Sequence, residues 1–270
     1  MTPLPGRLVL IGHPVTHSHS PAFQNAALRS AGLPLTYEAL DVSPGELERV
    51  AASLRAAGAA GNVTVPYKQA FVACCARLSP IAERVGAVNT FWCEDGALVG
   101  DNTAVGGFEE AVVRAFGAER RWPRIALIGA GGGAAAVLAA AERWFGTEVR
   151  VWSRSPGCAS TLARRFAGVG IPVVSLHDAL ERADLVVNAT PLGLAPGDAL
   201  PALIQDLPLR AAVFDLVYRR GDTAWVLAAR GAGHTAADGL GMLVAQGALA
   251  FERWFGQSPD RDAMWSALRS

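Results

Sequence analysis

Lysine is nearly absent from this chain: Lys68 is the single lysine, and the rest of the 24 basic residues are arginines. Arginine stays protonated at physiological pH, whereas a partly buried lysine can exchange a proton near neutral pH. The one lysine is therefore either a product of drift or a position that a guanidinium cannot fill. Lys68 follows a β-branched run that Pro66 ends, and α/β proteins place their chemistry where strands end.

Excess charge of either sign is also missing. The 24 basic and 24 acidic residues give a formal net charge of +0, and the arginines stand singly or in pairs such as Arg164-Arg165. A nucleic-acid-binding surface needs a basic patch or stripe. We therefore expect no nucleic-acid partner.

Cysteine is scarce, and long apolar runs are lacking. The four cysteines include no Cys-x-x-Cys pair, and the adjacent Cys74 and Cys75 are poorly placed to bridge each other. This usage is typical of a reducing cytoplasm, which is where we expect the protein to work. No apolar run approaches the roughly 20 residues of a membrane-spanning helix, so we expect neither a signal peptide nor a membrane partner.

Apolar residues in alternating strand-like and helix-like runs are abundant. The 270 residues, 51% of them hydrophobic, suffice for one large or two modest α/β domains. In the first part of the chain we predict a strand over 8–11, a helix over 21–31, a strand over 35–40, a helix over 44–57, a strand ending at Thr64, a hairpin of 91–93 with 97–100, and a helix after Phe108. This order predicts parallel strands with right-handed crossovers.

A second unit begins after Trp122-Pro123. There we predict strands over 124–128, 148–152, 172–175, 183–190 and 212–218, an alanine-rich helix after the first strand, a helix over 158–166, and a helical segment from Gly239 onward. The pattern predicts a doubly wound, Rossmann-type nucleotide-binding sheet. We expect this domain to span residues 105–238, and residues 1–104 with 239–270 to form an α/β substrate-binding domain.

A glycine motif marks the first turn of the second unit. Gly129-x-Gly131-x-x-Ala134 fits the dinucleotide-binding fingerprint in its alanine form, with a strand before it and a helix after it. Its glycines let the backbone approach a pyrophosphate, whose charge the helix N-terminus stabilises. The alternative is a glycine turn without a ligand, which this context makes the weaker interpretation.

Ser153-Arg154-Ser155 follow the next strand, where an NAD-selective site usually carries an acidic residue. A guanidinium with hydroxyls suits a 2′-phosphate, so NADP is favoured over NAD. The alternative is a solvated surface arginine.

Two hydroxyls precede the first predicted helix. Ser18 and Ser20 lie beside free amides at the helix start, which predicts a small anion site suited to a carboxylate. Taken alone, a purely structural interpretation is stronger, with Ser20 as the helix N-cap and Ser18 as a turn residue.

An ordered series of motifs places these residues in context. The series is HSxSP at 17–21, NVTxPxK at 62–68, GAVNT at 86–90, NTxxxGF at 102–108, VNATPLG at 187–193, DLVY at 215–218 and GxxMLVxQ at 239–246. Over essentially its whole length, the chain resembles the shikimate dehydrogenase family. The resemblance implies NADP-dependent interconversion of 3-dehydroshikimate and shikimate in aromatic amino-acid biosynthesis. We expect a monomer or homodimer and no metal ion.

The resemblance also implies roles for individual residues. Lys68 would transfer the proton, and Ser18 with Ser20 would hold the substrate carboxylate. The substrate ring would meet Thr64, Asn89, Tyr218 and Gln246, and the cofactor would meet Gly129, Ala130, Gly131, Gly132, Gly133, Ser153, Arg154, Ser155, Leu216 and Gly239. The structural alternatives are a turn former for Asn89, a core aromatic for Tyr218 and a helix-surface residue for Gln246.

One substrate-binding position departs from the family pattern. Family members read Asn-Thr-Asp where this chain reads Asn102-Thr103-Ala104, and the missing aspartate is the partner of the lysine. Asp101 is close in sequence, but we expect its side chain to point elsewhere. Since the other implied site residues are intact, a deliberate truncation of the site is favoured over a natural variant.

Two rival functions remain open. One is an enzyme of the same fold that acts on quinate or another cyclohexane acid. The other is a sensor that binds NADP and a carboxylate ligand without turnover, for which Ala104 is the main argument.

Overall fold

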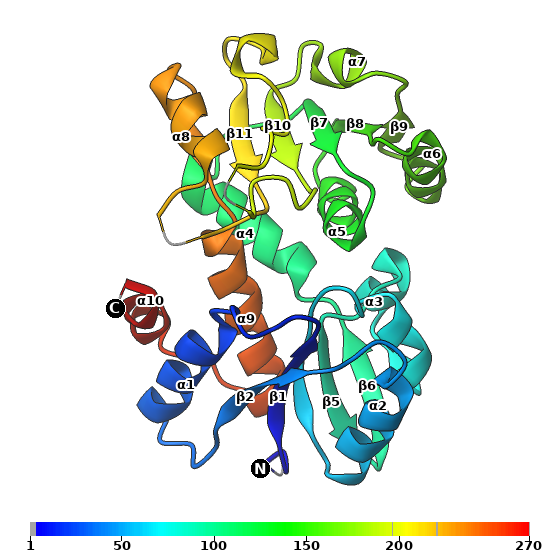
Figure 1. The fold of residues 1–270 in the computed structure, drawn as a ribbon, viewed down its shortest axis with the longest axis vertical. Helices are drawn as coiled ribbons and strands as arrows, with labels where there is room; N and C mark the ends of the chain where they lie inside the picture. The colour runs from blue at the N-terminus through cyan, green and yellow to red at the C-terminus, as the bar shows by residue number, and fades with distance from the viewer. Residues whose placement is uncertain (1–3, 196, 220, 270) are drawn as a thin grey trace. The chain divides into compact units, whose positions relative to one another are not determined.

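The structure is a computed structural model that describes residues 4–195, 197–219 and 221–269 (Figure 1). The chain divides into two compact units. Unit 1 comprises Met1–Gly107 and Leu243–Ser270, and unit 2 comprises Phe108–Met242. The boundaries expected from sequence, 104 and 239, lie a few residues earlier in the chain.

Unit 1 contains a mixed sheet with the strand order β2-β1-β3-β5-β6-β4. Its strands are β1 (Leu8–Gly12), β2 (Tyr37–Asp41), β3 (Ala60–Val63), β4 (Arg77–Leu78), β5 (Thr90–Glu94) and β6 (Ala97–Asp101). β1 pairs in parallel with β2 and β3, while β5 is antiparallel to both β3 and β6. The predicted β5–β6 hairpin is confirmed, and its turn has positive φ at Asp95 and Gly96.

The helical elements of unit 1 lie between and after these strands: α1 (Ser20–Ser30), α2 (Leu47–Ala56), η1 (Ala70–Cys74), α3 (Pro80–Val85), most of α9 (Leu240–Phe255) and α10 (Arg261–Arg269). Val9, Val63 and Phe91 from the strands pack with Leu54 of α2 and Phe71 of η1, all at most 1% exposed. Burying such side chains is worth roughly 1.5–3 kcal/mol each, which fixes the sheet that carries the site.

Helix α4 (Ala104–Phe116) begins earlier than predicted. The prediction placed the helix after Phe108, whereas the observed helix already includes Gly106 and Gly107. In the structure these glycines allow close packing on α9: a Cβ on Gly107 would lie 2.8 Å from Gln246 Cβ, and one on Gly106 would lie 2.9 Å from Leu249 Cδ1. The two glycines thus bring α4 and α9 close together.

Unit 2 is a parallel sheet with the order β12-β11-β10-β7-β8-β9. Its elements are β7 (Arg124–Ile128), α5 (Gly132–Ala141), β8 (Glu148–Trp152), α6 (Pro156–Arg165), β9 (Gly170–Pro172), α7 (Leu176–Leu180), β10 (Leu185–Asn188), η2 (Ile204–Asp206), β11 (Ala212–Asp215), α8 (Ala224–Gly231) and β12 (Ala236–Ala237). The strand order reverses beside β7, which is the switch point of a doubly wound sheet. The predicted fold class is confirmed.

Three strand predictions in unit 2 were wrong in extent. The strand predicted over 183–190 covers only Leu185–Asn188. The strand predicted over 172–175 ends at Pro172, because Ser175 caps α7: its hydroxyl accepts from the Asp178 N–H at 3.0 Å. The strand predicted over 212–218 ends at Asp215, because the Asp215 carboxylate accepts from the Val217 N–H at 3.0 Å and turns the chain. In the latter two cases a side chain captures a backbone amide, as Ser and Asp commonly do at turns.

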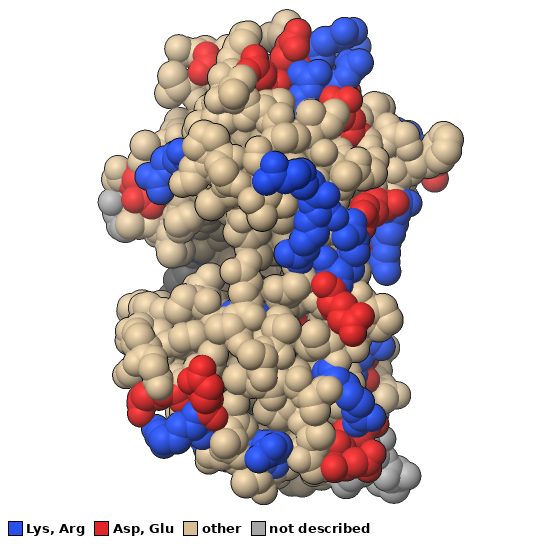
Figure 2. All heavy atoms as spheres, turned by 90° about the vertical axis from the view of Figure 1, so that its right-hand side faces the viewer, with Lys and Arg blue, Asp and Glu red and all other residues tan. Residues whose placement is uncertain are grey.

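The surface carries mixed charge, and on the face drawn in Figure 2 acidic side chains are interspersed among the basic ones. Within the described residues, no helix is both long enough and apolar enough to cross a membrane.

Candidate active site

The ends of several strands meet at one edge of the unit 1 sheet. Ile11 near the end of β1 pairs with Val63 at the end of β3. Thr90 at the start of β5 lies opposite both Asn62 and Asp101. The segments that follow β1, β3 and β6, and the residue that precedes β5, are therefore gathered at this edge. Four of the sequence motifs meet there.

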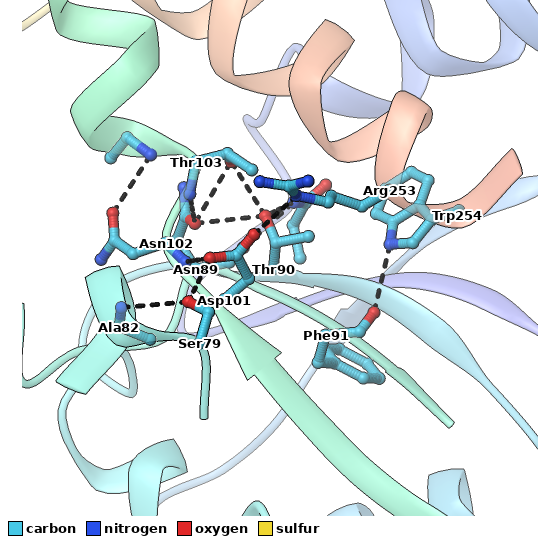
Figure 3. A network of polar contacts seen from close by, with 12 residues as sticks. Ser79, Ala82, Asn89, Thr90, Phe91, Asp101, Asn102, Thr103, Arg253 and Trp254 are labelled. Atoms are coloured by element: carbon cyan, nitrogen blue, oxygen red, sulfur yellow. Dashed lines mark hydrogen bonds and ion pairs between the residues drawn. The ribbon is translucent and has the colours of Figure 1, made fainter. Parts of the chain in front are cut away.

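Asn89 is the centre of a polar network at this edge (Figure 3). It is 3% exposed. Its Nδ2 donates to Gln246 Oε1 at 3.1 Å, and its Oδ1 accepts from the Thr103 N–H at 2.8 Å and the Thr90 hydroxyl at 3.1 Å. The structure thus brings together two predicted site residues that are far apart in the sequence. Asn89 is held on both sides of its amide, so its role exceeds that of a turn former.

Residues that sequence analysis assigned no role extend this network. Asn62 Nδ2 donates to Asn89 O and to Thr90 Oγ1, both at 3.0 Å, and the Tyr37 hydroxyl donates to Asn62 Oδ1 at 2.8 Å. The Thr90 and Thr103 hydroxyls lie 2.9 Å apart. The only signal in the sequence was that Asn62, Thr90 and Thr103 lie inside the quoted motifs.

Lys68 follows β3 and is tied to the same edge through its backbone. Its carbonyl accepts from the Val88 N–H at 2.7 Å, next to Asn89. Its side chain is partly buried, and this burial lowers the pKa of Lys68 from its ordinary value. Within the described part of the chain no carboxylate forms an ion pair with its ammonium group. A lysine in this condition can donate and recover a proton closer to neutral pH.

Ala104 is the first residue of α4 and is 3% exposed. Its N–H donates to Asn102 Oδ1 at 3.1 Å, so the backbone at this position is fixed while the side chain is only a methyl group. The neighbouring Asp101 is 2% exposed and its carboxylate accepts from Ser79, Asn102 and Arg253. The Asp101 carboxylate is therefore engaged by these three groups, and it does not replace the acid that position 104 lacks.

Ser18 and Ser20 lie at the start of α1. Ser20 is the first helical residue and 7% exposed, and His19 is the N-cap. The interpretation of Ser20 as the N-cap is therefore wrong. The Ser18 hydroxyl accepts from the Ser20 N–H at 3.2 Å, as a turn residue does. Thr64 follows β3, and its N–H donates to Ile11 O at 2.8 Å, which ties it to the strand before Ser18.

In unit 2 the glycine turn connects β7 to α5. Gly129 has φ +116, and a Cβ there would lie 2.9 Å from Ala189 O, so this position requires glycine. Gly131 is the extended N-cap of α5. Apart from the adjoining residues and the backbone of the helix itself, no heavy atom lies within 4 Å of a Cβ built on Gly131 or Gly132. The turn therefore leaves open space beside the first turn of a helix, which fits a pyrophosphate.

The other predicted cofactor residues lie at the same edge of the unit 2 sheet. Ile128 pairs with Trp152, so Ser153–Ser155 leave β8 beside the glycine turn. The Ser153 hydroxyl donates to Ser155 O at 2.9 Å and accepts from the Ser155 N–H, and this turn leaves Arg154 exposed. Leu216 Cδ1 lies 3.7 Å from a Cβ built on Gly133. The predicted cofactor segments thus converge.

Gly239 packs directly on the segment that follows β11. A Cβ at Gly239 would lie 2.3 Å from Leu216 O, and its N–H donates to Val217 O at 3.0 Å. Tyr218, predicted as a substrate contact, comes next in this segment and belongs to unit 2. The adjacent Asp238 was not predicted from sequence: burial raises its pKa to about 6, although its carboxylate accepts from the Leu240 N–H at 3.1 Å.

Parts of the chain match two known family domains. Residues 10–91 match the shikimate dehydrogenase substrate binding domain, and residues 239–269 match the shikimate 5′-dehydrogenase C-terminal domain. A shikimate dehydrogenase (NADP(+)) from Rubrobacter xylanophilus is 46% identical over 272 residues, which cover 96% of this chain and 94% of that protein.

Solved structures show the same similarity. Shikimate 5-dehydrogenase from Thermus thermophilus, in complex with NADP(H) and shikimate, superposes with a TM-score of 0.88 at 40% identity, covering 97% of this chain and 98% of that one. Quinate dehydrogenase from Corynebacterium glutamicum, in complex with NAD, has a TM-score of 0.87 at 28% identity, covering 97% and 98%. The resemblance predicted from the motifs is confirmed, and the chain belongs to the shikimate dehydrogenase family.

Proposed function

We propose that this chain is an NADP-dependent oxidoreductase that interconverts 3-dehydroshikimate and shikimate, and that Ala104 impairs its turnover. The main support is the similarity to the Rubrobacter xylanophilus shikimate dehydrogenase (NADP(+)) over nearly the full length. Within this chain, the Asn89–Gln246 contact supports the proposal, because it joins two of the motifs at the edge that also carries Lys68.

The substrate would be held mainly by unit 1. Ser18 and Ser20, at the start of α1, suit the carboxylate because hydroxyls and helix-start amides favour an anion. Thr64, Asn89 and Gln246 offer hydrogen-bonding groups for a hydroxylated ring, and the amide of Asn89 is held in place by Thr103 and Thr90. Tyr218 of unit 2 is proposed as a further contact to the substrate.

The cofactor would be held by unit 2. Residues Gly129–Gly133 would hold the pyrophosphate, for which Gly131 and Gly132 leave open space, and Arg154 with Ser153 and Ser155 would bind the 2′-phosphate. Leu216 and Gly239 would lie along the nicotinamide. When bound, NADPH supplies the hydride that reduces the ketone carbon.

Lys68 would donate a proton to the alkoxide oxygen that develops during reduction and would accept it in the reverse direction. Burial lowers its pKa, which brings the two protonation states closer in free energy at neutral pH. An acid at position 104 would orient this ammonium group and the substrate. Ala104 can do neither, so we expect binding without efficient turnover.

Calorimetry tests the proposal directly. We expect the chain to bind shikimate and NADP, and to bind NADP more tightly than NAD. If the chain bound NADP but not shikimate, the proposed substrate would be wrong and the chain would be a nucleotide-binding protein with a different substrate.

Quinate is the second candidate substrate, because the similar structure from Corynebacterium glutamicum is a quinate dehydrogenase. Parallel titrations with shikimate and quinate decide between them, and tighter quinate binding would reassign the chain. The sensor hypothesis predicts that both ligands bind but that Ala104→Asp produces no turnover.

We also propose a cytoplasmic location, supported by four cysteines that are all free. A monomeric or homodimeric state is proposed as well, and light scattering on the purified protein measures it.

A further inference from the structure

The segment that links β6 to α4 is held by one buried carboxylate. Asp101 Oδ1 accepts from the Asn102 N–H at 2.7 Å, and it also accepts from the Ser79 hydroxyl. Asp101 Oδ2 accepts from Arg253 Nε–H at 2.8 Å. The Ser79 hydroxyl also caps α3 by accepting from the Ala82 N–H at 3.1 Å. Asp101 thereby joins β6, α3 and α9 at the residue that precedes Asn102-Thr103-Ala104.

Arg253 supplies the charge that this carboxylate requires. The Asp101 side chain is 2% exposed, whereas that of Arg253 is 60% exposed. A carboxylate buried to this degree is strongly destabilising without a partner, while an exposed arginine loses little when unpaired. Asp101 therefore depends on the ion pair more than Arg253 does. Arg253 stabilises the buried Asp101 carboxylate, and thereby the position of residues 102–104.

The same face of α9 also carries Gln246. Seven residues make about two turns of a helix, so Gln246 and Arg253 project from one face. Gln246 holds Asn89 at 3.1 Å, and Asn89 in turn accepts from the Thr103 N–H at 2.8 Å. Asp101 O accepts from the Asn89 N–H at 3.1 Å. These contacts close a ring through Asp101, Thr103, Asn89, Gln246 and Arg253, most of which is visible in Figure 3.

We infer that Asp101 and Arg253 form a positioning pair for the substrate ring. Their ion pair fixes the distance between α9 and the 102–104 segment, and so sets the geometry in which Asn89 and Gln246 meet the ligand. Neither residue need touch the ligand. The inference rests on the proposed shikimate function, and it assigns to Arg253 a role that its exposed position conceals.

Calorimetric titration of the full chain with shikimate tests the inference. We expect Arg253→Leu and Asp101→Asn each to weaken shikimate binding on the order of tenfold, with NADP binding unchanged because its proposed residues lie in unit 2. Arg253→Lys keeps the charge but loses the Nε–H donor, so we expect an intermediate loss. The double variant should bind shikimate about as weakly as either single variant, because the two residues act as one unit.

Trp254→Phe is the matched control. Trp254 Nε1 donates to Phe91 O at 3.1 Å and anchors α9 to β5 outside the ring of contacts. This variant should lower the thermal midpoint and leave shikimate affinity within about twofold of the parent. Circular dichroism on every variant verifies folding, and if Arg253→Leu does not fold, Arg253→Lys carries the test.

The outcomes separate the inference from the proposed function. If the parent binds shikimate and the variants at 101 and 253 bind it equally well, the positioning role is wrong and the function stands. If Trp254→Phe weakened shikimate binding as much as the variants at 101 and 253 do, the Asp101–Arg253 pair would only help to hold α9 in place, which also overturns the inference. If the parent itself fails to bind shikimate, both proposals fall.

Discussion

The candidate binding edges of the two units differ in whether backbone or side-chain groups form them. In unit 2 the edge consists of backbone: a glycine with φ +116, open space at Gly131 and Gly132, and a close approach of Gly239 to Leu216 O. In unit 1 the edge consists of side chains from distant segments, such as Asn89 with Gln246 and Asp101 with Arg253. An edge formed by the backbone is specified by a short stretch of sequence, and an added methyl group can disturb it. An edge formed by side chains depends on partners that lie far away in the sequence, which no local pattern reveals.

The largest effect is expected at Lys68, because we propose that this residue transfers a proton in addition to carrying a charge. In an Ala104→Asp background, we expect Lys68→Arg to lower the rate of shikimate oxidation about 10²- to 10⁴-fold, nearly as much as Lys68→Ala, because arginine cannot release a proton at neutral pH. Steady-state kinetics measure the loss. Substantial activity of Lys68→Arg would show that the residue acts through its charge.

Gly131→Ala should separate folding from cofactor binding in unit 2. The added methyl group meets no protein atom within 4 Å, and φ at this residue is −90. We therefore expect an unchanged thermal midpoint but NADP affinity weakened by about tenfold or more, since the methyl group occupies the space proposed for the pyrophosphate. Shikimate binding should stay the same.

Gly129→Ala is the paired comparison, because it places a methyl group 2.9 Å from Ala189 O at φ +116. That variant should lose stability by about 1–3 kcal/mol as well as NADP affinity. If Gly131→Ala bound NADP normally, the assignment of the glycine turn would be wrong.

Arg154 gives a smaller and more specific effect. We expect Arg154→Ala to weaken NADP binding about tenfold and to leave NAD binding nearly unchanged, because the guanidinium would pair only with the additional phosphate. Arg164→Ala, an exposed arginine on α6, is the control and should affect neither cofactor. Equal binding of NADP and NAD by the parent would contradict the assignment of the 2′-phosphate site.

Asp238 should make a modest contribution to pH dependence. Its pKa is raised from 3.8 to about 6 by burial, so between these values the unfolded chain has released the proton that the folded chain retains. The free energy of unfolding should therefore fall, through this group, as the pH rises from about 4 to about 6. Chemical denaturation of the parent and Asp238→Asn across this range measures the difference, and parallel curves would show that Asp238 is not perturbed.

The contrast between the units explains what the sequence could predict. A strand–glycine turn–helix pattern is local, so the doubly wound sheet of unit 2 and the glycine turn at Gly129 were predicted correctly, while the cofactor role of this turn stays a prediction. Errors arose where one side chain captured a backbone amide, as Asp215 does at the end of β11 and Ser175 does before α7. The start of α4 at Ala104 was not predicted either: Gly107 packs on Gln246, a partner that lies far away in the sequence.

In unit 1, Lys68, Ser18 and Ser20 were noticed from the sequence pattern and the other site residues came from the resemblance to a family, but neither source predicted their connections. Nothing near Asn89 in the sequence indicates that its amide meets Gln246, or that Thr103 fixes its orientation. Arg253 has no motif at all, and its partner Asp101 was noticed only as a neighbour of Ala104. Such contacts are decided by how α9 returns to the sheet, which is a property of the folded chain.

The central claim is that a nearly complete site lacks one carboxylate, at Ala104. The most direct test is the steady-state rate of NADPH formation from shikimate and NADP for the parent, Ala104→Asp and the nearly isosteric Ala104→Asn. We predict that Ala104→Asp exceeds the parent by about 10²- to 10⁴-fold, and that Ala104→Asn stays near the parent because an amide cannot pair with the lysine as a carboxylate does. A parent rate equal to that of Ala104→Asp, or no gain on restoring the aspartate, would contradict the claim.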